Sequence, residues 1–135
     1  MLNKAKSFLS EGYTLALVSD AETITSQARG VRPLLDLFDT GRDFSSFCAA
    51  DKVVGRGAAF LYLLLGVKEL YAGVISEAAL EILENAGTRV TFSCLVPRIL
   101  NRTGDGFCPI ESCVMNRRDS QEALVAIKEK LSELA

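Results

Sequence analysis

A cysteine that directly precedes a proline has a setting that could activate its thiol. Cys108 follows the glycine-containing segment 103–106, and Pro109 is well placed to open a short helix. A thiol at a helix N-terminus has a lowered pKa, so Cys108 is a candidate nucleophile or sulfur carrier. Glu111 would lie in the same first turn, where it could act as acid or base. Its negative charge would also disfavour ionisation of the Cys108 thiol. A structural or incidental cysteine is the simpler interpretation, and both stay open.

The absence of histidine limits what the cysteines and serines can do. The 135 residues contain no histidine, which excludes a Cys–His pair and a Ser–His–Asp triad. Structural zinc sites use paired ligands two to four residues apart, whereas the closest cysteines, Cys108 and Cys113, are five apart. On one helix they would diverge by about 140°. We therefore predict no metal site and no cofactor, and we expect Cys48, Cys94 and the others to be reduced thiols.

Charged residues also precede the most apolar part of the chain. We predict a helix from Ala50 to Leu65, with Asp51 and Lys52 in its first turn. An acid in that position interacts favourably with the helix dipole, which explains Asp51 without a ligand. Lys52 and Arg56 would lie one turn apart and could provide positive charge for an anion. Asp51 is also a candidate acid or base.

A capping serine and two glycines belong to the same central part of the chain. Ser76 is a good N-cap for a helix from Glu77 to Ala86, and capping is the simpler interpretation of this serine. Gly55 and Gly57 would each lower the stability of the predicted helix 50–65 by about 1 kcal/mol. Close packing of that helix explains them most simply, and backbone approach to a ligand is the alternative.

Composition excludes several classes of function. The net charge is −2, so the overall balance provides no concentrated basic face for a nucleic-acid backbone. The longest apolar run, 58–65, is far shorter than the ~20 residues that a membrane-spanning helix needs. The first residues also lack the apolar region of a secretion signal. We expect one cytoplasmic domain, 1–135, with neither nucleic-acid nor membrane partners.

The elements that must position these residues follow from the pattern of apolar and turn residues. Helices are predicted at 3–11, 31–38, 50–65, 77–86 and 109–115, with a final helix that opens on an Asp119–Glu122 capping box. Strands are predicted at 13–18, 22–26, 69–75 and 89–96, the first two as an antiparallel hairpin. The unit from Leu70 to Val96 implies a parallel pair with a right-handed crossover. The expected fold is α/β, a three-layer α-β-α sandwich with a mixed sheet.

Three stretches, together with this order of elements, resemble a known superfamily. The order is similar to the cytidine-deaminase-like fold. The stretches 50–59, 96–102 and 108–111 resemble a small uncharacterised bacterial family within that superfamily, generally described as a domain of unknown function. The resemblance covers nearly the whole chain. It implies that two helix N-termini meet at one site, which here would be the helix starts near residues 50 and 77.

In zinc deaminases of this superfamily, those two helix starts carry the metal ligands. The first has a His-x-Glu or Cys-x-Glu signature, and the second has Pro-Cys-x-x-Cys. The matching segments here, Ala49–Lys52 and Ile75–Ala79, contain neither histidine nor cysteine. Deamination by a zinc-bound hydroxide therefore does not carry over to this chain.

Two hypotheses about function follow. The first is a binding module that holds a small anionic or nucleotide-like ligand at the two converging helix N-termini. The residues lining that site would be Asp51, Lys52, Arg56, Ser76 and Glu77. The second is a zinc-independent enzyme that uses Cys108 as nucleophile or sulfur carrier, with Asp51 or Glu111 as acid or base. Since proteins of the deaminase-like fold often self-associate, we also expect a homodimer.

Overall fold

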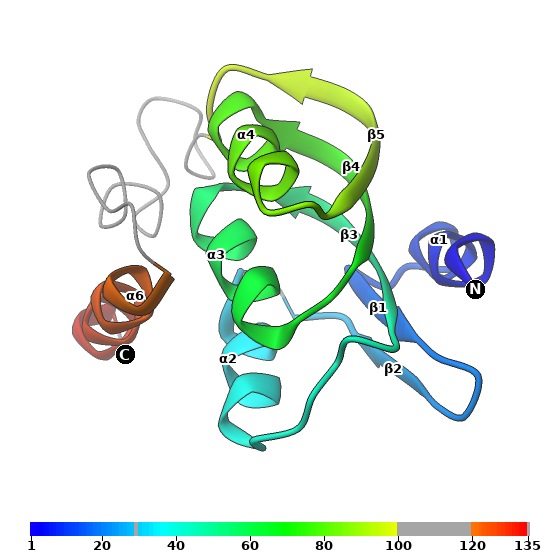
Figure 1. Ribbon diagram of the computed structural model, residues 1–135, viewed down its shortest axis with the longest axis horizontal. Helices are drawn as coiled ribbons and strands as arrows, with labels where there is room; N and C mark the ends of the chain where they lie inside the picture. Colours follow the sequence, from blue (N-terminus) through cyan, green and yellow to red (C-terminus); the bar gives the residue numbers. More distant parts are fainter. Residues whose placement is uncertain (29, 100–119, 135) are drawn as a thin grey trace.

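The polypeptide folds into a five-stranded sheet with helices on both faces (Figure 1). The computed structural model describes residues 1–28, 30–99 and 120–134. Its helices are α1 (Leu2–Ser10), α2 (Arg32–Asp39), α3 (Arg56–Leu65), α4 (Glu77–Asn85) and α6 (Ser120–Leu134). Its strands are β1 (Leu15–Val18), β2 (Thr23–Ser26), β3 (Cys48–Val54), β4 (Glu69–Ser76) and β5 (Arg89–Val96). The short helix predicted at 109–115 lies outside the described residues.

The sheet is mixed, as the sequence predicted. Its strand order is β2-β1-β3-β4-β5. β1 pairs antiparallel with both neighbours, so that Leu15 lies opposite Ser26 on one side and Asp51 on the other. β3, β4 and β5 run parallel, and α3 and α4 are the crossover helices that connect them. In Figure 1, α1 lies on one face of the sheet and α2, α3 and α4 lie on the other.

The largest difference from the sequence prediction concerns residues 48–65. They form strand β3 and helix α3, separated by Gly55, instead of a single helix that begins at Ala50. β3 is a central strand whose first three residues are all buried, so it lacks the alternation of a half-exposed strand. Without that alternation, a short apolar run cannot be told from a buried helix by its pattern alone. The β-branched pair Val53 and Val54, directly before a glycine, was the available signal for a strand.

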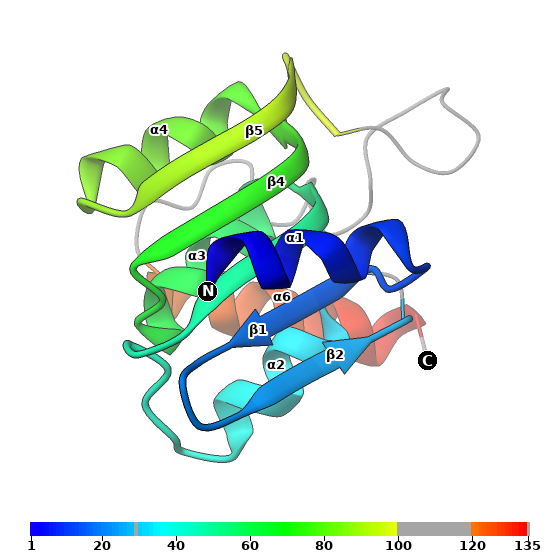
Figure 2. The ribbon, with the colours of Figure 1, turned by 90° about the vertical axis from the view of Figure 1, so that its right-hand side faces the viewer.

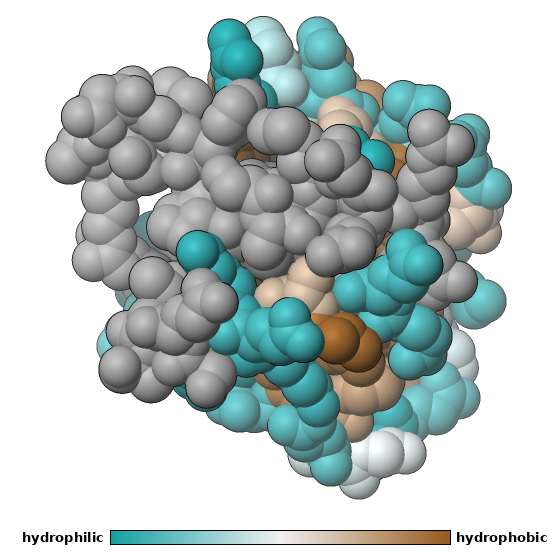
Figure 3. Space-filling view, turned by 90° about the vertical axis from the view of Figure 1, so that its left-hand side faces the viewer, coloured by the Kyte–Doolittle hydropathy of each residue, from teal (hydrophilic) through white to brown (hydrophobic). Residues whose placement is uncertain are grey.

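The helical layer of α2, α3 and α4 covers the larger apolar face of the sheet. Fully buried members of this core include Leu17, Leu61, Leu70 and Leu83. α6 packs against α3 from the outside, through Leu124 and Ile127 of the apolar stripe that the sequence predicted. Figure 3 looks onto this side of the molecule, where both apolar and hydrophilic side chains of the described residues are visible. The expected three layers are therefore present, with α6 added outside the helical layer.

The other face of the sheet is only partly covered. α1 packs on β1 and β3 through a small cluster of Ala5, Ala16, Val18 and Ala50. Figure 2 shows α1 lying over these strands, with β4 and β5 beside it. Most residues of β5 are exposed. The edge strand β5 is therefore accessible next to α1.

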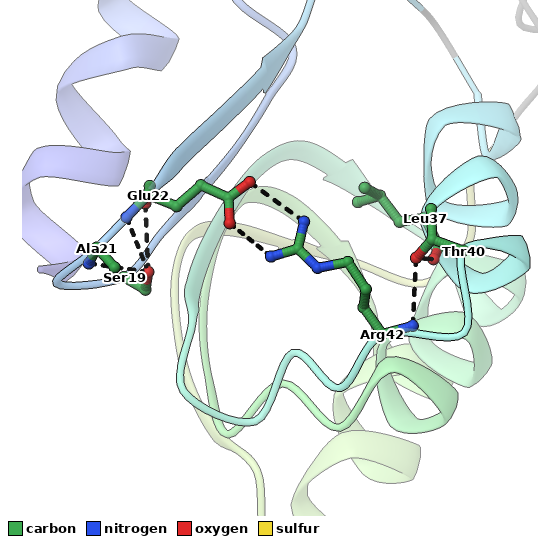
Figure 4. A network of polar contacts seen from close by, with 6 residues as sticks. All are labelled: Ser19, Ala21, Glu22, Leu37, Thr40 and Arg42. Atoms are coloured by element: carbon green, nitrogen blue, oxygen red, sulfur yellow. Dashed lines mark hydrogen bonds and ion pairs between the residues drawn. The ribbon is translucent and has the colours of Figure 1, made fainter.

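A surface ion pair joins the β1–β2 turn to the segment between α2 and β3. Arg42 Nη1 donates to Glu22 Oε2 at 3.2 Å, and Arg42 Nη2 donates to Glu22 Oε1 (Figure 4). Thr40 Oγ1 accepts from the Arg42 amide at 3.3 Å, and Ser19 Oγ accepts from the Glu22 amide at 3.1 Å. The pair links the two loops. Because both charged partners are exposed, it adds little to the stability of the protein.

α3 is the most apolar helix, and seven of its ten residues are buried. It packs against α2, α4 and α6, which makes it the centre of the helical layer. Within the described ranges, no helix combines the length and the hydrophobicity needed to cross a membrane. The apolar character of α3 is therefore accounted for by packing within the domain.

Candidate functional site

Two helices begin next to each other at the carboxyl edge of the parallel strands. β3 and β4 pair with Val54 opposite Ile75. α3 starts directly after Gly55, and α4 starts directly after Ser76. First-turn amides and the positive ends of two helix dipoles therefore lie together at one edge of the sheet. Open parallel sheets bind their ligands at this edge.

Among the described residues, no side chain caps the start of α3. Gly55 is the N-cap residue, in an extended conformation, and the first backbone hydrogen bond of the helix runs from Ala59 N to Gly55 O at 2.9 Å. The amides of Arg56, Gly57 and Ala58 precede that bond, and both Gly57 and Ala58 are buried. A buried helix end without a side-chain cap is unusual, and an anion is a suitable acceptor for its amides.

The two glycines near this helix start differ from the prediction. Gly55 precedes α3, so the cost of a glycine in a helix interior does not apply to it. Gly57 lies in the first turn and is buried. Because glycine has no side chain, a glycine at these positions is compatible with close packing and with backbone approach to a ligand, the two interpretations of the sequence.

The start of α4 is capped as the sequence predicted. Ser76 is 3% exposed, and its Oγ accepts a hydrogen bond from Ala79 N at 3.2 Å. Glu77 is the first residue of the helix and is exposed, with its negative charge near the positive end of the dipole. The serine serves the third amide of α4, so the amides of Glu77 and Ala78 are left to other acceptors.

Asp51 and Lys52 do not lie at a helix start. Both belong to β3, where successive side chains point to opposite faces of the sheet. Asp51 faces α3 and contacts Tyr62, whereas Lys52 lies on the side of α1. The helix-dipole interpretation of Asp51 is therefore wrong, and Lys52 and Arg56 are not neighbours on one helix.

The sheet thus divides the predicted ligand-binding residues. Arg56, Ser76 and Glu77 stand at the paired starts of α3 and α4. Asp51 lies on the same side of the sheet, further back along β3, and Lys52 lies on the opposite side. Three of the five residues therefore stand at the paired helix starts, although α3 begins at Arg56 and not near residue 50.

Asp51 and Tyr62 form a largely buried pair between β3 and α3. The Tyr62 hydroxyl donates to Asp51 Oδ2 at 2.7 Å, and the Val53 amide donates to Oδ1 at 3.3 Å. Burial raises the pKa of Asp51 to about 6, although these bonds and one from the Lys52 amide favour the ionised form. Burial, followed by the neighbouring carboxylate, raises the pKa of Tyr62 well above its usual value. Asp51 can therefore exchange a proton near neutral pH.

Tyr62 lies eleven residues after Asp51 and was not among the predicted site residues. A tyrosine within an apolar run is ordinarily a core residue, so its position gave no indication of a polar partner. A buried tyrosine hydroxyl needs a hydrogen-bond acceptor, and this requirement was the available signal. Asp51 was the only carboxylate in the predicted apolar segment 50–65.

Two of the cysteines, Cys48 and Cys94, lie in the described part of the chain, and Cys108 does not. Cys48 Sγ donates to Glu69 Oε1 at 3.2 Å, and burial, followed by that carboxylate, raises the pKa of the thiol, which disfavours a thiolate nucleophile. Cys94 is exposed on β5. Cys108 and Glu111 lie outside the described residues, so their proposed roles stay predictions. Within the described part of the chain, no three His, Cys, Asp or Glu side chains are arranged to hold a metal ion.

Comparisons with known proteins identify a family. Residues 3–131 match the family described as "TM1506: Domain of unknown function (DUF1893)". The fold is similar to the crystal structure of a DUF1893 family protein (TM1506) from Thermotoga maritima, with a TM-score of 0.84 and 27% sequence identity. That similarity covers 97% of this chain and 87% of the other. No curated protein matches the chain. The predicted resemblance to an uncharacterised family is thus confirmed, and the chain belongs to the DUF1893 family.

Proposed function

We propose that this chain is a binding module that holds a small anion at the paired starts of α3 and α4. The observation that carries the proposal is the buried start of α3, which has no side-chain cap among the described residues, beside the start of α4. Amides that precede the first helical hydrogen bond, at the positive ends of two dipoles, form a preorganised site. A phosphate or a carboxylate suits such a site.

Arg56 supplies positive charge to this site. It is the first residue of α3 and is half-buried at the carboxyl edge of the sheet. A guanidinium can bind a phosphate or a carboxylate through two parallel hydrogen bonds, and burial reduces screening of its charge. Glu77 has the opposite effect, because its carboxylate at the start of α4 repels an incoming anion.

We further propose that the fold is cytidine-deaminase-like, which favours a nucleotide-like ligand. The mixed sheet and the two adjacent helix starts agree with what that resemblance implies. Because α3 starts at Arg56, the first signature position corresponds to residues 55–57 instead of 49–52. Neither this segment nor Ser76–Ala79 contains histidine or cysteine, the usual nitrogen and sulfur ligands of zinc. The nucleotide-like character of the ligand rests on analogy of fold.

The binding proposal can be tested with two arginines that each open a helix. Arg56 opens α3, and Arg32, an exposed residue, opens α2. In isothermal titration with cytidine monophosphate, R56Q should bind about tenfold more weakly, because a charge-assisted hydrogen bond is lost. R32Q should bind like the wild type. Absence of wild-type binding, or an equal loss in R32Q, would contradict the proposal.

Glu77 provides a variant with the opposite expected effect. E77Q removes an exposed negative charge at the start of α4 and should tighten cytidine monophosphate binding about twofold. Because the side chain is exposed, the substitution leaves the core unchanged. Weaker binding by E77Q would place the anion elsewhere.

A zinc-independent enzyme is the second candidate, and the Asp51–Tyr62 pair favours it. A carboxyl group with a pKa of about 6 beside a hydroxyl can transfer protons near neutral pH. In this alternative, Cys108 is the nucleophile or sulfur carrier, and Glu111 is a further acid or base. Fast alkylation of Cys108 by iodoacetamide, independent of pH near neutrality, would support the enzyme. Alkylation no faster than that of free cysteine would contradict it.

A second copy of the chain is the partner that we propose for β5. This strand is at the edge of the sheet, and Phe92 and Leu95 are 40% and 43% exposed. Arg89, at its first residue, is its one charged side chain. In an antiparallel pair of β5 strands, the two Arg89 residues would lie at opposite ends, so no like charges would meet in the middle. Such a pair would join the two sheets and cover the edge of β5 that no described strand pairs with.

A further inference from the structure

A groove lies between α1 and the accessible face of β4. It has a volume of about 450 Å³. Lys6 and Ser10 of α1 form one wall, and Lys52 of β3 and Tyr71 of β4 line the other. The groove is lined by residues of α1 and by residues on the face of the sheet that carries α1. Figure 2 looks onto this face, and α3 and α4 lie behind the sheet. The groove is therefore separate from the site at the two helix starts.

The packing of α1 explains why this space is open. The helix sits on β1 and β3 over a cluster of small side chains, mainly alanines, and does not extend over the whole of β4. Gly73, two residues after Tyr71, lines the groove without a side chain. A Cβ at Gly73 would come within 2.8 Å of the Lys52 carbonyl oxygen, so the close approach of β3 and β4 excludes one. The backbone of the sheet therefore keeps the floor of the groove free of a side chain.

The groove is positively charged although the chain has a net charge of −2. Lys6 and Lys52 approach it from opposite walls, and the described residues that line it include no carboxylate. Lys6 Nζ lies 4.4 Å from the centroid of the Tyr71 ring, a cation–π contact that keeps the ammonium beside the groove. Two ammonium groups thus face one cavity without a negative side chain in its lining.

We propose that this groove binds a small phosphate ester. Lysine ammonium groups bind phosphate as point charges, and two of them on opposite walls suit a dianion. The hydroxyl of Ser10 and the amide of Asn3 add hydrogen-bonding groups, and the Tyr71 ring provides an apolar surface for the organic part. The volume matches that of sites for small metabolites. This inference does not depend on the site at the starts of α3 and α4.

Two of the three tyrosines make a direct test. Tyr71 lines the groove, whereas Tyr62 lies on the other side of the sheet beside Asp51. Titration with glycerol 3-phosphate should shift the ring resonances of Tyr71 in aromatic ¹H–¹³C spectra, because the phosphate draws Lys6 away from the ring. Those of Tyr62 should stay in place, and uncharged glycerol should shift neither. A Tyr71 ring that does not respond would overturn the proposal.

Lysine variants identify the charges that matter. K6Q and K52Q should each weaken glycerol 3-phosphate binding about tenfold. K4Q removes the same charge from an exposed position of α1 outside the groove lining, and should change binding by less than about twofold. An equal loss in K4Q would mean that binding reflects overall charge and would reject the groove. If R56Q lost glycerol 3-phosphate binding and K6Q did not, the phosphate would be assigned to the start of α3. That result would also reject the groove as the binding site.

Discussion

At the scale of single residues, the Asp51–Tyr62 pair makes the stability of the protein depend on pH. The pKa of Asp51 in the folded state, about 6, is higher than the roughly 3.9 of an exposed aspartate. Between these values the folded state binds more protons than the unfolded state, so stability falls as pH rises through this window. A shift of this size corresponds to about 3 kcal/mol at neutral pH. Ionised Asp51 is therefore destabilising, unlike a carboxylate in an ion pair.

Replacing Asp51 by asparagine should remove this penalty and keep an acceptor for Tyr62. Urea unfolding at about pH 4.5 and about pH 7.5 should show D51N gaining stability over the wild type as pH rises, by about 2 kcal/mol, because part of the penalty is already present at the lower pH. Asp43 is the matched control, because hydrogen bonds from the amide and hydroxyl of Ser45 lower its pKa. D43N should show no such gain. A D51N difference that is constant with pH would mean that Asp51 titrates as an ordinary exposed carboxyl.

At the scale of elements, the two adjacent helix starts are held in different ways. α4 has a buried serine cap, so S76A should lower the free energy of unfolding by about 1 kcal/mol in urea denaturation. Ser7 is the control, since its exposed hydroxyl bonds to Lys4 O within α1. S7A should change stability by less than about 0.5 kcal/mol. Equal effects of the two substitutions would show that the cap does not stabilise α4.

The elements that were predicted most accurately from the sequence have residues that mark where they begin or end. The bounds 89–96 of β5 were correct, and the start of α4 was correct because Ser76 marks it. β3 was missed because its first residues are buried on both faces, and this error placed Asp51 and Lys52 in a helix. The face on which each side chain lies depends on the pairing of β3 with β1 and β4. Helical periodicity holds no information about that pairing, so Lys52 was assigned to the wrong site.

At the scale of the whole molecule, the position of the site follows from strand order. The sequence predicted the mixed sheet and the parallel unit that contains α4, and the structure confirms both. The groove beside α1 could not be predicted, because it depends on where α1 rests on the sheet. The alanines that set this position come from three separate elements, and no local pattern connects them.

The proposed dimer belongs to the same scale. Sedimentation should show a dimer for the wild type and a monomer for F92K, because a lysine on an edge strand opposes pairing with a second copy. V125K is the control, since Val125 is a 56% exposed apolar residue on α6, away from β5. V125K should remain dimeric. A monomeric wild type, or a dimeric F92K, would remove β5 as the interface.

The most direct test of the central claim is to find where an anion binds. In ¹H–¹⁵N spectra of the labelled protein titrated with cytidine monophosphate, the amides of Gly57, Ala58 and Glu77 should shift most, because they begin α3 and α4 and face the anion. The first-turn amides of α2 serve as the reference for a helix start outside the proposed site. Shifts at Gly57, Ala58 and Glu77 no larger than those at the start of α2 would contradict the claim.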